Sequence, residues 1–405
     1  MKISQIAALT NAIVGEMTGD ATIVQEDLKN IVDVGTIVMT QANWYDAYTK
    51  SLMDHVGKCV VTNKEFFPNK VFERLWKESY EFGAILERLT VTLPDAEDNP
   101  SWDLQDQQSY NSEIFYKPTV AMNCYNVKDT FQIPISIVED QVKSAFSSRE
   151  QYIAFVSGIY TAVNNSVKIR LEQMAKRAVN NMIFSTFSNA VTNSEYDTQG
   201  TDDGNARCIN VLHKYNTLFN QTLTAAEAIH DKEFLRYFSF LLYLTSDRMR
   251  EISTIFNVIG EVRFTEREDQ NIFVLSEIAK ALDVYLYGDT YHDEYVKLPG
   301  YETVTAWQGI NDGNAQVFEF PSTSLINIKN AEVPDHVNNT PIEGVAAVIF
   351  DREAVAVTNE RAKVTSAYSA RGDFTTYYYK NELGLLNDLS MNCVVFTILD
   401  DTSGS

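Results

Sequence analysis

A run of apolar residues between Ser148 and Phe187 constrains the fold more than any other feature of this sequence. Steps of three and four residues place its members on one face of a helix. Ser148 and Gln151 form a capping box at its start. We expect a helix of about 40 residues that spans about 60 Å. The apolar residues are Ile153, Val156, Ile159, Val163, Val167, Leu171, Met174, Ala178 and Met182.

The same segment carries a basic cluster in an otherwise acidic chain. The cluster consists of Lys168, Arg170, Lys176 and Arg177, whereas the net charge of the chain is -22. One interpretation is a solvated helix face. The other is a contact with an acidic neighbouring subunit or with nucleic acid. The overall negative charge disfavours direct readout of nucleic acid and binding to anionic membranes.

Length and composition indicate a folded protein with more than one core. A chain of 405 residues exceeds one ordinary core, so we expect two or more subdomains. The shares of hydrophobic residues (45%) and charged residues (22%) are those of a folded soluble protein. Aromatic residues make up 12%, which fits an aromatic core and an interface between subunits equally well.

A long hairpin with an exposed tip is predicted for residues of about 89 to 120. A strand over Leu89–Leu93 ends at Pro94, and extended structure resumes over Ile114–Val120. An apolar core cannot hold the acidic segment between them, so the tip must be solvated or docked on a partner. Its acids are Asp95, Glu97, Asp98, Asp103, Asp106 and Glu113, against one base, Lys117. The candidate contact residues of the tip are Asp95, Glu97, Asp98, Trp102, Asp103, Asp106 and Tyr110.

The segments around the hairpin predict less regular structure. Residues 1–64 look like an arm that packs on something else, with a short amphipathic helix at the start and another around Asn43–Val56. Some helical turn is expected over residues 71–88. A strand over Asp129–Val138 contains Pro134, which removes a ladder donor, so the strand should lie at a sheet edge or be bulged.

Residues 207–343 predict a compact subdomain of mixed helix and strand. We expect a helix over 206–219, and a second long helix introduced by the capping box of Thr224 and Glu227. The apolar face of that second helix runs to Phe256. A short helix over Ile272–Ala281 and a strand over Val284–Tyr287 follow.

The last part of the chain, Gly344–Leu399, predicts β-strands and contains no nucleophile motif, metal-binding cluster or phosphate-binding loop. Strands are predicted over Val345–Phe350 and Val394–Leu399, with a further strand and an aromatic strand between them. Arg371-Gly372-Asp373 matches a cell-adhesion tripeptide, but its glycine suits the turn between two strands. We expect these strands to complete one sheet beside the long helix.

The sequence contains no recognisable motif for catalysis or metal binding. GxGxxG after a strand, GxxxxGK[ST], HExxH and GxSxG are all absent. The segment His292-Asp293-Glu294 is best interpreted as a solvated loop, because adjacent side chains point different ways. Cys59, Cys124, Cys208 and Cys393 are far apart, which predicts neither a disulfide framework nor a zinc site. We expect no cofactor and no catalytic residue, and no run approaches a membrane span.

Several segments of the sequence resemble one family. They are DKEFLRYFSFLLYLTSDRMREISTIFN, LSEIAKALDVYLYGDTYHDEYVKLPGYETVTAWQG, VAAVIFDREAVAVTN and NELGLLNDLSMNCVVFTI. Together with the order of the predicted elements, they resemble the major capsid proteins of tailed bacteriophages, which have the Hong Kong 97 fold. The amino-acid sequences of these segments are similar to those of the capsid proteins of podovirus-like phages. The likeness covers most of the chain from about residue 65.

The resemblance implies an α+β fold with named parts. These are an N-terminal arm (1–64), the E-loop with the first P-domain strand (65–147), the P-domain spine helix (148–190), an A-domain with insertions (191–343) and the P-domain return strands with the C-terminus (344–405).

The resemblance also implies a non-catalytic subunit of an icosahedral shell that encloses a double-stranded DNA genome. The implied partners are further copies in pentamers and hexamers, a separate scaffolding protein, a portal protein at one vertex and DNA bound without sequence specificity. No membrane is involved, and assembly in the bacterial host cytoplasm would place the chain in the virion. An encapsulin-type shell protein and an enzyme with an α/β domain at 207–343 stay open as alternatives.

Overall fold

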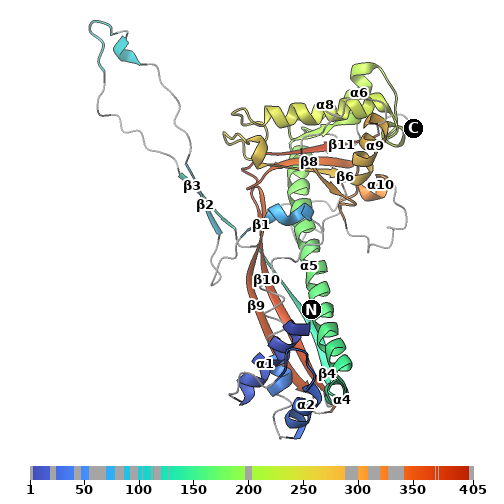
Figure 1. The fold of residues 1–405 in the computed structure, drawn as a ribbon. Coiled ribbons are helices and arrows are strands. Elements are labelled where there is room, and N and C mark those ends of the chain that lie inside the picture. The colour runs from blue at the N-terminus through green and yellow to red at the C-terminus, as the bar shows by residue number, and fades with distance from the viewer. Residues whose placement is uncertain are drawn as a thin grey trace. The chain divides into compact units, whose positions relative to one another are not determined.

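The computed structural model places the described residues in two units (Figure 1). Unit 1 comprises Met1–Gly83, Lys128–Arg177 and Val357–Leu385, and unit 2 comprises Ala84–Val127, Ala178–Ala356 and Leu386–Ser405. The structure describes residues 3–18, 24–40, 47–53, 70–77, 86–91, 99–102, 104–110, 113, 120–125, 127–196, 203–287, 300–308, 320–326, 342–369, 371–372 and 374–400.

A four-stranded sheet with strand order β1-β9-β10-β4 organises unit 1. Its strands are β1 (Trp76–Lys77), β9 (Val355–Ser369), β10 (Phe374–Asn387) and β4 (Val127–Val138). Because β4 is an edge strand, Pro134 costs no ladder bond on its free side, and the edge predicted from that proline is confirmed. The helices are α1 (Ile3–Thr18), α2 (Ile31–Thr40), 47–53, η1 (Lys70–Leu75), α4 (Glu139–Ala145) and α5 (Arg149–Thr192), which belongs to unit 1 as far as Arg177 and to unit 2 beyond it.

The long helix is confirmed as α5, which has 44 residues. The Ser148 hydroxyl accepts the backbone N–H of Gln151 at 3.2 Å, as an N-cap should. Only part of the predicted apolar face is fully buried. Val156 and Val163 are inaccessible to solvent, whereas Leu171 is half-buried at the margin of the core.

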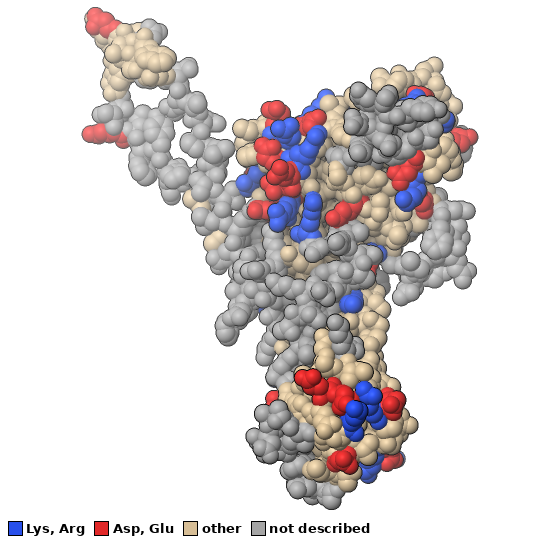
Figure 2. Space-filling model, in the orientation of Figure 1, with Lys and Arg blue, Asp and Glu red and all other residues tan. Residues whose placement is uncertain are grey.

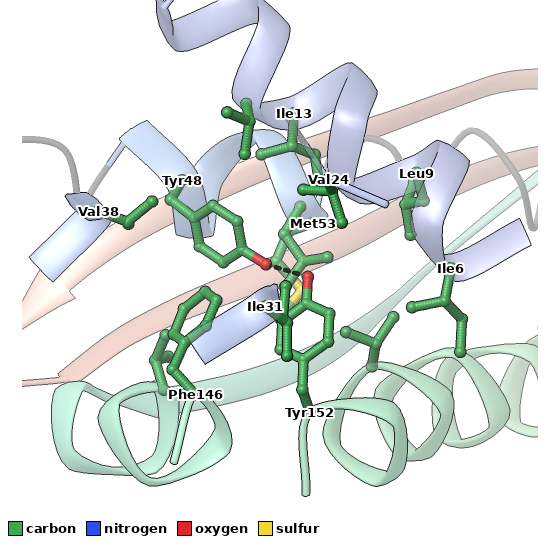
Figure 3. Packing of buried hydrophobic residues seen from close by; sticks show 14 of the residues in the cluster. Ile6, Leu9, Ile13, Val24, Ile31, Val38, Tyr48, Met53, Phe146 and Tyr152 are labelled. Carbon is green, nitrogen blue, oxygen red and sulfur yellow. Dashed lines mark hydrogen bonds between the residues drawn. The ribbon is translucent and has the colours of Figure 1, made fainter. Parts of the chain in front are cut away.

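The first helices of the chain complete the core of unit 1 (Figure 3). Ile6, Ile13 and Ile31 from α1 and α2 are buried in one cluster with residues of α5 and the sheet. A β-carbon added at Gly35 would meet the Phe146 ring at 2.5 Å, so only glycine lets α2 approach this closely. The predicted short N-terminal helix is confirmed, and so is the helix around 43–56 where it is described, over residues 47–53.

A chain of hydroxyl groups crosses this core. The Thr10 hydroxyl donates to the Ile6 carbonyl at 2.8 Å and lies 2.8 Å from the Tyr152 hydroxyl, which in turn bonds the Tyr48 hydroxyl (Figure 3). Burial raises the pKa of Tyr152 to about 12, and burial also raises the pKa of Tyr48 well above its usual range. The network therefore stays neutral and satisfied inside an apolar cluster.

Removing the Tyr152 hydroxyl should cost more than removing that of Tyr48. Tyr152→Phe leaves the buried Tyr48 hydroxyl without this partner, which costs about 2 kcal/mol. Tyr48→Phe leaves Tyr152 bonded to Thr10 and should cost about 1 kcal/mol. Urea denaturation of both variants measures the difference, and equal losses would contradict the proposed order of the network.

A five-stranded sheet with strand order β5-β11-β8-β6-β7 forms the core of unit 2. Its strands are β5 (Cys208–Asn210), β11 (Cys393–Thr397), β8 (Val345–Asp351), β6 (Gln270–Leu275) and β7 (Glu302–Val304). β8 is antiparallel to both β11 and β6, and every residue of these three strands is buried. The single sheet expected for the closing strands is wrong, because β8 and β11 lie here while β9 and β10 lie in the four-stranded sheet.

Helices flank the sheet of unit 2, with α6 and α8 along β11 and α9 beside β6 (Figure 1). The rings of Phe238 on α8 and Phe396 on β11 meet at 6.3 Å. Cys208 and Cys393 are free, buried thiols on neighbouring strands, and burial raises the pKa of both. The helices are α6 (Val211–Phe219), α7 (Ala225–Ala228), α8 (Lys232–Arg248), α9 (Ser276–Tyr287) and α10 (Phe320–Thr323).

Two predictions around α9 are wrong. Ile272 to Leu275 are strand, because a short run of apolar residues is equally typical of a buried strand. The helix begins at Ser276 and continues through Val284–Tyr287, which had been predicted as strand. The expected helical turn over 71–88 is confirmed in part as η1, which β1 follows directly; β2 begins at Leu86, and residues 78–85 lie outside the described residues.

The boundaries of α6 and α8 also differ from the prediction. α6 begins only after β5, where the Asn210 side chain accepts the backbone N–H of His213. The capping box of Thr224 and Glu227 is confirmed, but it starts the short α7. α8 is capped by Asp231 and ends at Arg248, eight residues before Phe256, so the end of the predicted apolar face lies in a loop.

Candidate assembly surfaces

The predicted hairpin is confirmed, with shifted strand boundaries. β2 (Leu86–Val91) pairs antiparallel with β3 (Val120–Tyr125), and Val91 lies opposite Val120. Among the described residues, this pair is the one nearest the hairpin tip. Val120 and Met122 of β3 are 50% and 56% exposed, so apolar side chains of the hairpin face solvent in the single subunit.

The hairpin tip is ordered by its own side chains. The Asn99 carboxamide oxygen accepts the Ser101 backbone N–H at 3.0 Å and the Ser101 hydroxyl at 2.7 Å, which starts η3 (Pro100–Trp102). The Tyr110 hydroxyl accepts the backbone N–H of Gln105 at 3.1 Å and donates to Gln108 at 3.2 Å. The hydrogen bonds shown for residues 99–110 join these residues to one another.

This tip presents large apolar groups to solvent. Trp102 is 89% exposed and Leu104 is 66% exposed, and Tyr110 is exposed as well. Exposed aromatic residues surrounded by polar residues are typical of a surface that meets another protein. Of the predicted contact residues, Trp102, Asp106 and Tyr110 are described and exposed, whereas Asp95, Glu97, Asp98 and Asp103 lie outside the described residues.

Three members of the basic cluster on α5 have partners within unit 1. Arg177 forms an ion pair with Asp129 at 2.7 Å, and Lys176 pairs with Glu172 at 3.8 Å. The Arg170 guanidinium lies 5.9 Å from the centre of the Phe131 ring. Lys168 is half-buried. Two members of the cluster, Arg170 and Arg177, therefore contact β4. A contact between the cluster and a neighbouring subunit stays a prediction.

The outer face of the four-stranded sheet carries further lysines. Tyr377 and Tyr379 point into the core, so the alternating residues Thr376, Tyr378 and Lys380 point away from it. A groove of about 580 Å³ on this sheet is lined by Lys363 and Lys380 together with Glu382. This outer groove is an open surface with two basic groups in a chain whose net charge is -22.

Unit 2 also has an exposed apolar loop, which was not predicted from the sequence. Residues 249–266, named here the apolar loop, follow α8 and expose five large apolar side chains. A signal was present, because Asn257 and Gly260 interrupt the helical pattern while the apolar content stays high. The exposed residues are Ile252, Ile255, Ile259, Val262 and Phe264.

Charged residues surround the apolar loop. Ion pairs join Arg250 to Glu266 at 3.5 Å and Arg267 to Asp247 at 2.7 Å. On the face shown in Figure 2, acidic and basic side chains of the described residues lie interspersed. Apolar groups within a rim of both charges are the usual anatomy of a protein interface.

No group of three or more His, Cys, Asp or Glu within the described ranges could hold a metal ion. Among the helices that the structure describes, none combines the length and apolar character needed to cross a membrane. These features define a class of protein that works by binding other protein molecules through its surface. The features are the ordered sheets, the protruding apolar groups and the acidic hairpin.

This chain belongs to the Phi29-like phage major capsid protein family, whose model matches residues 8–397 of its 405. No curated protein matches it. A chain in the structure of the head fiber and inner core protein gp22 of native bacteriophage P68 is similar, with 13% identity and a TM-score of 0.51 over 83% of this chain and 86% of that one. The capsid structure of Staphylococcus phage Andhra gives 13% identity and a TM-score of 0.49 over 82% and 85%.

The chain is accordingly a structural protein of a phage shell with the Hong Kong 97-like mixed fold. Its copies assemble into a lattice, and it resides in the virion. The encapsulin-type alternative is set aside, because the matching family is that of a phage capsid protein.

Proposed function

We propose that copies of this chain form pentamers and hexamers of an icosahedral shell that encloses a double-stranded DNA genome. Unit 1 corresponds to the P-domain with its spine helix α5, the β2–β3 hairpin to the E-loop, and most of unit 2 to the A-domain. The observation that carries the proposal is the hairpin tip, where Trp102 is 89% exposed on a turn held by its own hydrogen bonds. Such a preorganised aromatic group fits a docking site on a neighbouring copy.

The outer groove is the surface that we assign to receive the tip. The acidic segment between Pro94 and Pro118 carries six acids against one base, and Lys363 and Lys380 line the groove. Opposite charges across an interface steer two copies into register and disfavour wrong pairings. Trp102 and Leu104 would supply the apolar contacts that the charges position.

Partners other than further copies of the chain are proposed from the family and from the net charge of the chain. We propose a separate scaffolding protein during assembly, a portal protein at one vertex, and assembly in the bacterial host cytoplasm. The packaged DNA would be enclosed without sequence-specific contacts, because a net charge of -22 disfavours close approach of the chain to nucleic acid. The subunit would act by its shape and carry out no reaction.

Assembly of this acidic subunit should be faster at moderately higher salt. Like charges have to come together, and raising the ionic strength from 0.01 M to 0.1 M shortens the screening length from about 30 Å to about 10 Å. Light scattering of the purified full-length chain measures the rate, and negative-stain electron microscopy identifies the product. Faster growth of icosahedral particles is expected. Slower growth with salt would contradict charge repulsion as the barrier, and an absence of particles at every ionic strength would contradict the shell function.

A further inference from the structure

The apolar loop is held rigidly in place, although its side chains are exposed. Ser253 and Arg263 exchange two backbone hydrogen bonds of 2.9 Å, which close its base. The Cys393 backbone N–H donates to the Phe256 carbonyl at 2.9 Å, and the Asn257 carbonyl accepts from the Arg207 guanidinium at 2.9 Å. The exposed side chains of this loop are thus preorganised.

The loop is anchored at one end of the five-stranded sheet. The Thr265 hydroxyl donates to the Asp351 carboxylate at 2.7 Å, and Asp351 is the last residue of β8. The Cys393 anchor is the first residue of β11. Because β8 and β11 are antiparallel and Cys393 lies opposite Phe350, these two anchors lie at the same end of the sheet.

A pocket of about 550 Å³ lies at the other end of the same sheet. We name it the α7–α9 pocket; Asp400, which follows β11, is part of its wall and accepts the Ala225 backbone N–H. Phe320 of α10 also lines it, and α10 leads to Ser324, whose carbonyl accepts the N–H of Val345 at the start of β8. Most of its other walls are apolar, and His230, Glu277 and Lys280 lie among them; the apolar walls are Ala225, Ala226, Ile229, Ala281, Val284 and the Tyr285 ring.

A projecting apolar loop and an apolar pocket thus stand about 20 Å apart, at opposite ends of one buried sheet. At about half exposure, each large side chain of the loop leaves on the order of 100 Å² accessible, or about 500 Å² for the five. That area is comparable to the apolar share of the ~800 Å² that each partner buries in a standard interface. The loop therefore has enough apolar surface for one stable contact.

We propose that the apolar loop of one copy docks into the α7–α9 pocket of the next copy in a ring; this inference rests on the shell function proposed above. Every copy carries both halves of the contact, so no other protein is needed to fill the pocket. The two surfaces differ, which makes the contact head-to-tail, and head-to-tail contacts close into rings when the rotation permits. Ile259 and Val284, exposed by 57% and 67%, face each other across this contact.

Cysteine crosslinking of the full-length chain tests the contact. The background carries Cys59→Ser and Cys124→Ser, since Cys208 and Cys393 are buried. With a short bismaleimide, the Ile259→Cys/Val284→Cys chain should give a ladder of covalent oligomers that ends at the pentamer or hexamer. An equal mixture of the two single variants should stop at dimers, because each molecule then has one reactive partner.

The controls separate this contact from assembly in general. Phe240→Cys combined with Val284→Cys is the matched control, because Phe240 is 58% exposed on α8, and no ladder is expected from it. Shells that form without the Ile259–Val284 ladder would overturn this inference alone. Dimers of Ile259→Cys by itself would also overturn it, since they would show a loop-to-loop contact. If the background chain formed no oligomer at all, this result would contradict the proposed shell function and, with it, the docking of the apolar loop.

Discussion

Val163→Asp should destabilise the subunit by about 4 kcal/mol or more, the largest effect that we expect from a single substitution. Val163 is inaccessible to solvent and packs in the cluster that α5 shares with α1, α2 and the four-stranded sheet. A carboxylate there has to be buried without a partner or protonated at a cost, and the lost valine contacts add to this. Chemical denaturation of the isolated subunit measures the loss.

Ile169→Asp is the matched control for this substitution. Ile169 lies on the same helix and is also β-branched, but 59% of it is exposed. Its replacement should change the free energy of unfolding by no more than about 0.5 kcal/mol. Equal losses for the two variants would contradict the assignment of the buried face of α5. Leu171, half-buried at the margin, should fall between them.

The features that the sequence predicts best are those set by one local rule. The steps of three and four along residues 148–187 specify a helix whatever surrounds it, and α5 is that helix. Pro134 excludes an interior strand for a reason that no tertiary contact can change, and β4 is an edge strand. The acidic segment after Pro94 cannot enter a core, which leaves a projecting hairpin.

The features that the sequence fails to predict depend on distant partners. Ile272 to Leu275 could be helix or strand by pattern, and they become strand because β8 and β7 flank them. The division of the closing strands between two sheets follows from β5 and β6, which lie far away along the chain. The sequence predicts an arm that packs on something else, but it cannot show that α1 and α2 pack into the core of unit 1, because the residues they contact lie far away along the chain.

The candidate assembly surfaces were predicted in part. The tip was recognised from its acids, but the exposed Trp102 and its local hydrogen bonds are visible only in the structure. The basic cluster on α5 seemed free in sequence, yet Asp129 and Phe131 of β4 engage two of its members. Only the first part of the apolar loop, as far as Phe256, was predicted as a helix face, because periodicity alone cannot show that α8 ends at Arg248.

Replacing residues 95–112 by a short Gly-Ser linker should abolish closed shells while the subunit stays folded. The described tip residues bond to one another, so their loss removes no hydrogen bond from either core. Pairing of β2 with β3 is retained. The melting temperature of the isolated subunit should therefore be unchanged, whereas the contact made by Trp102 and the tip acids is lost.

Electron microscopy of particles from the parent chain and the tip-deleted chain, under identical assembly conditions, tests the central claim most directly. The claim is that the hairpin tip of each copy docks on a neighbouring copy and so closes the shell. We predict icosahedral particles from the parent chain, and open sheets or unassembled subunits from the deleted chain. Normal closed particles from the deleted chain, at an unchanged melting temperature, would contradict it.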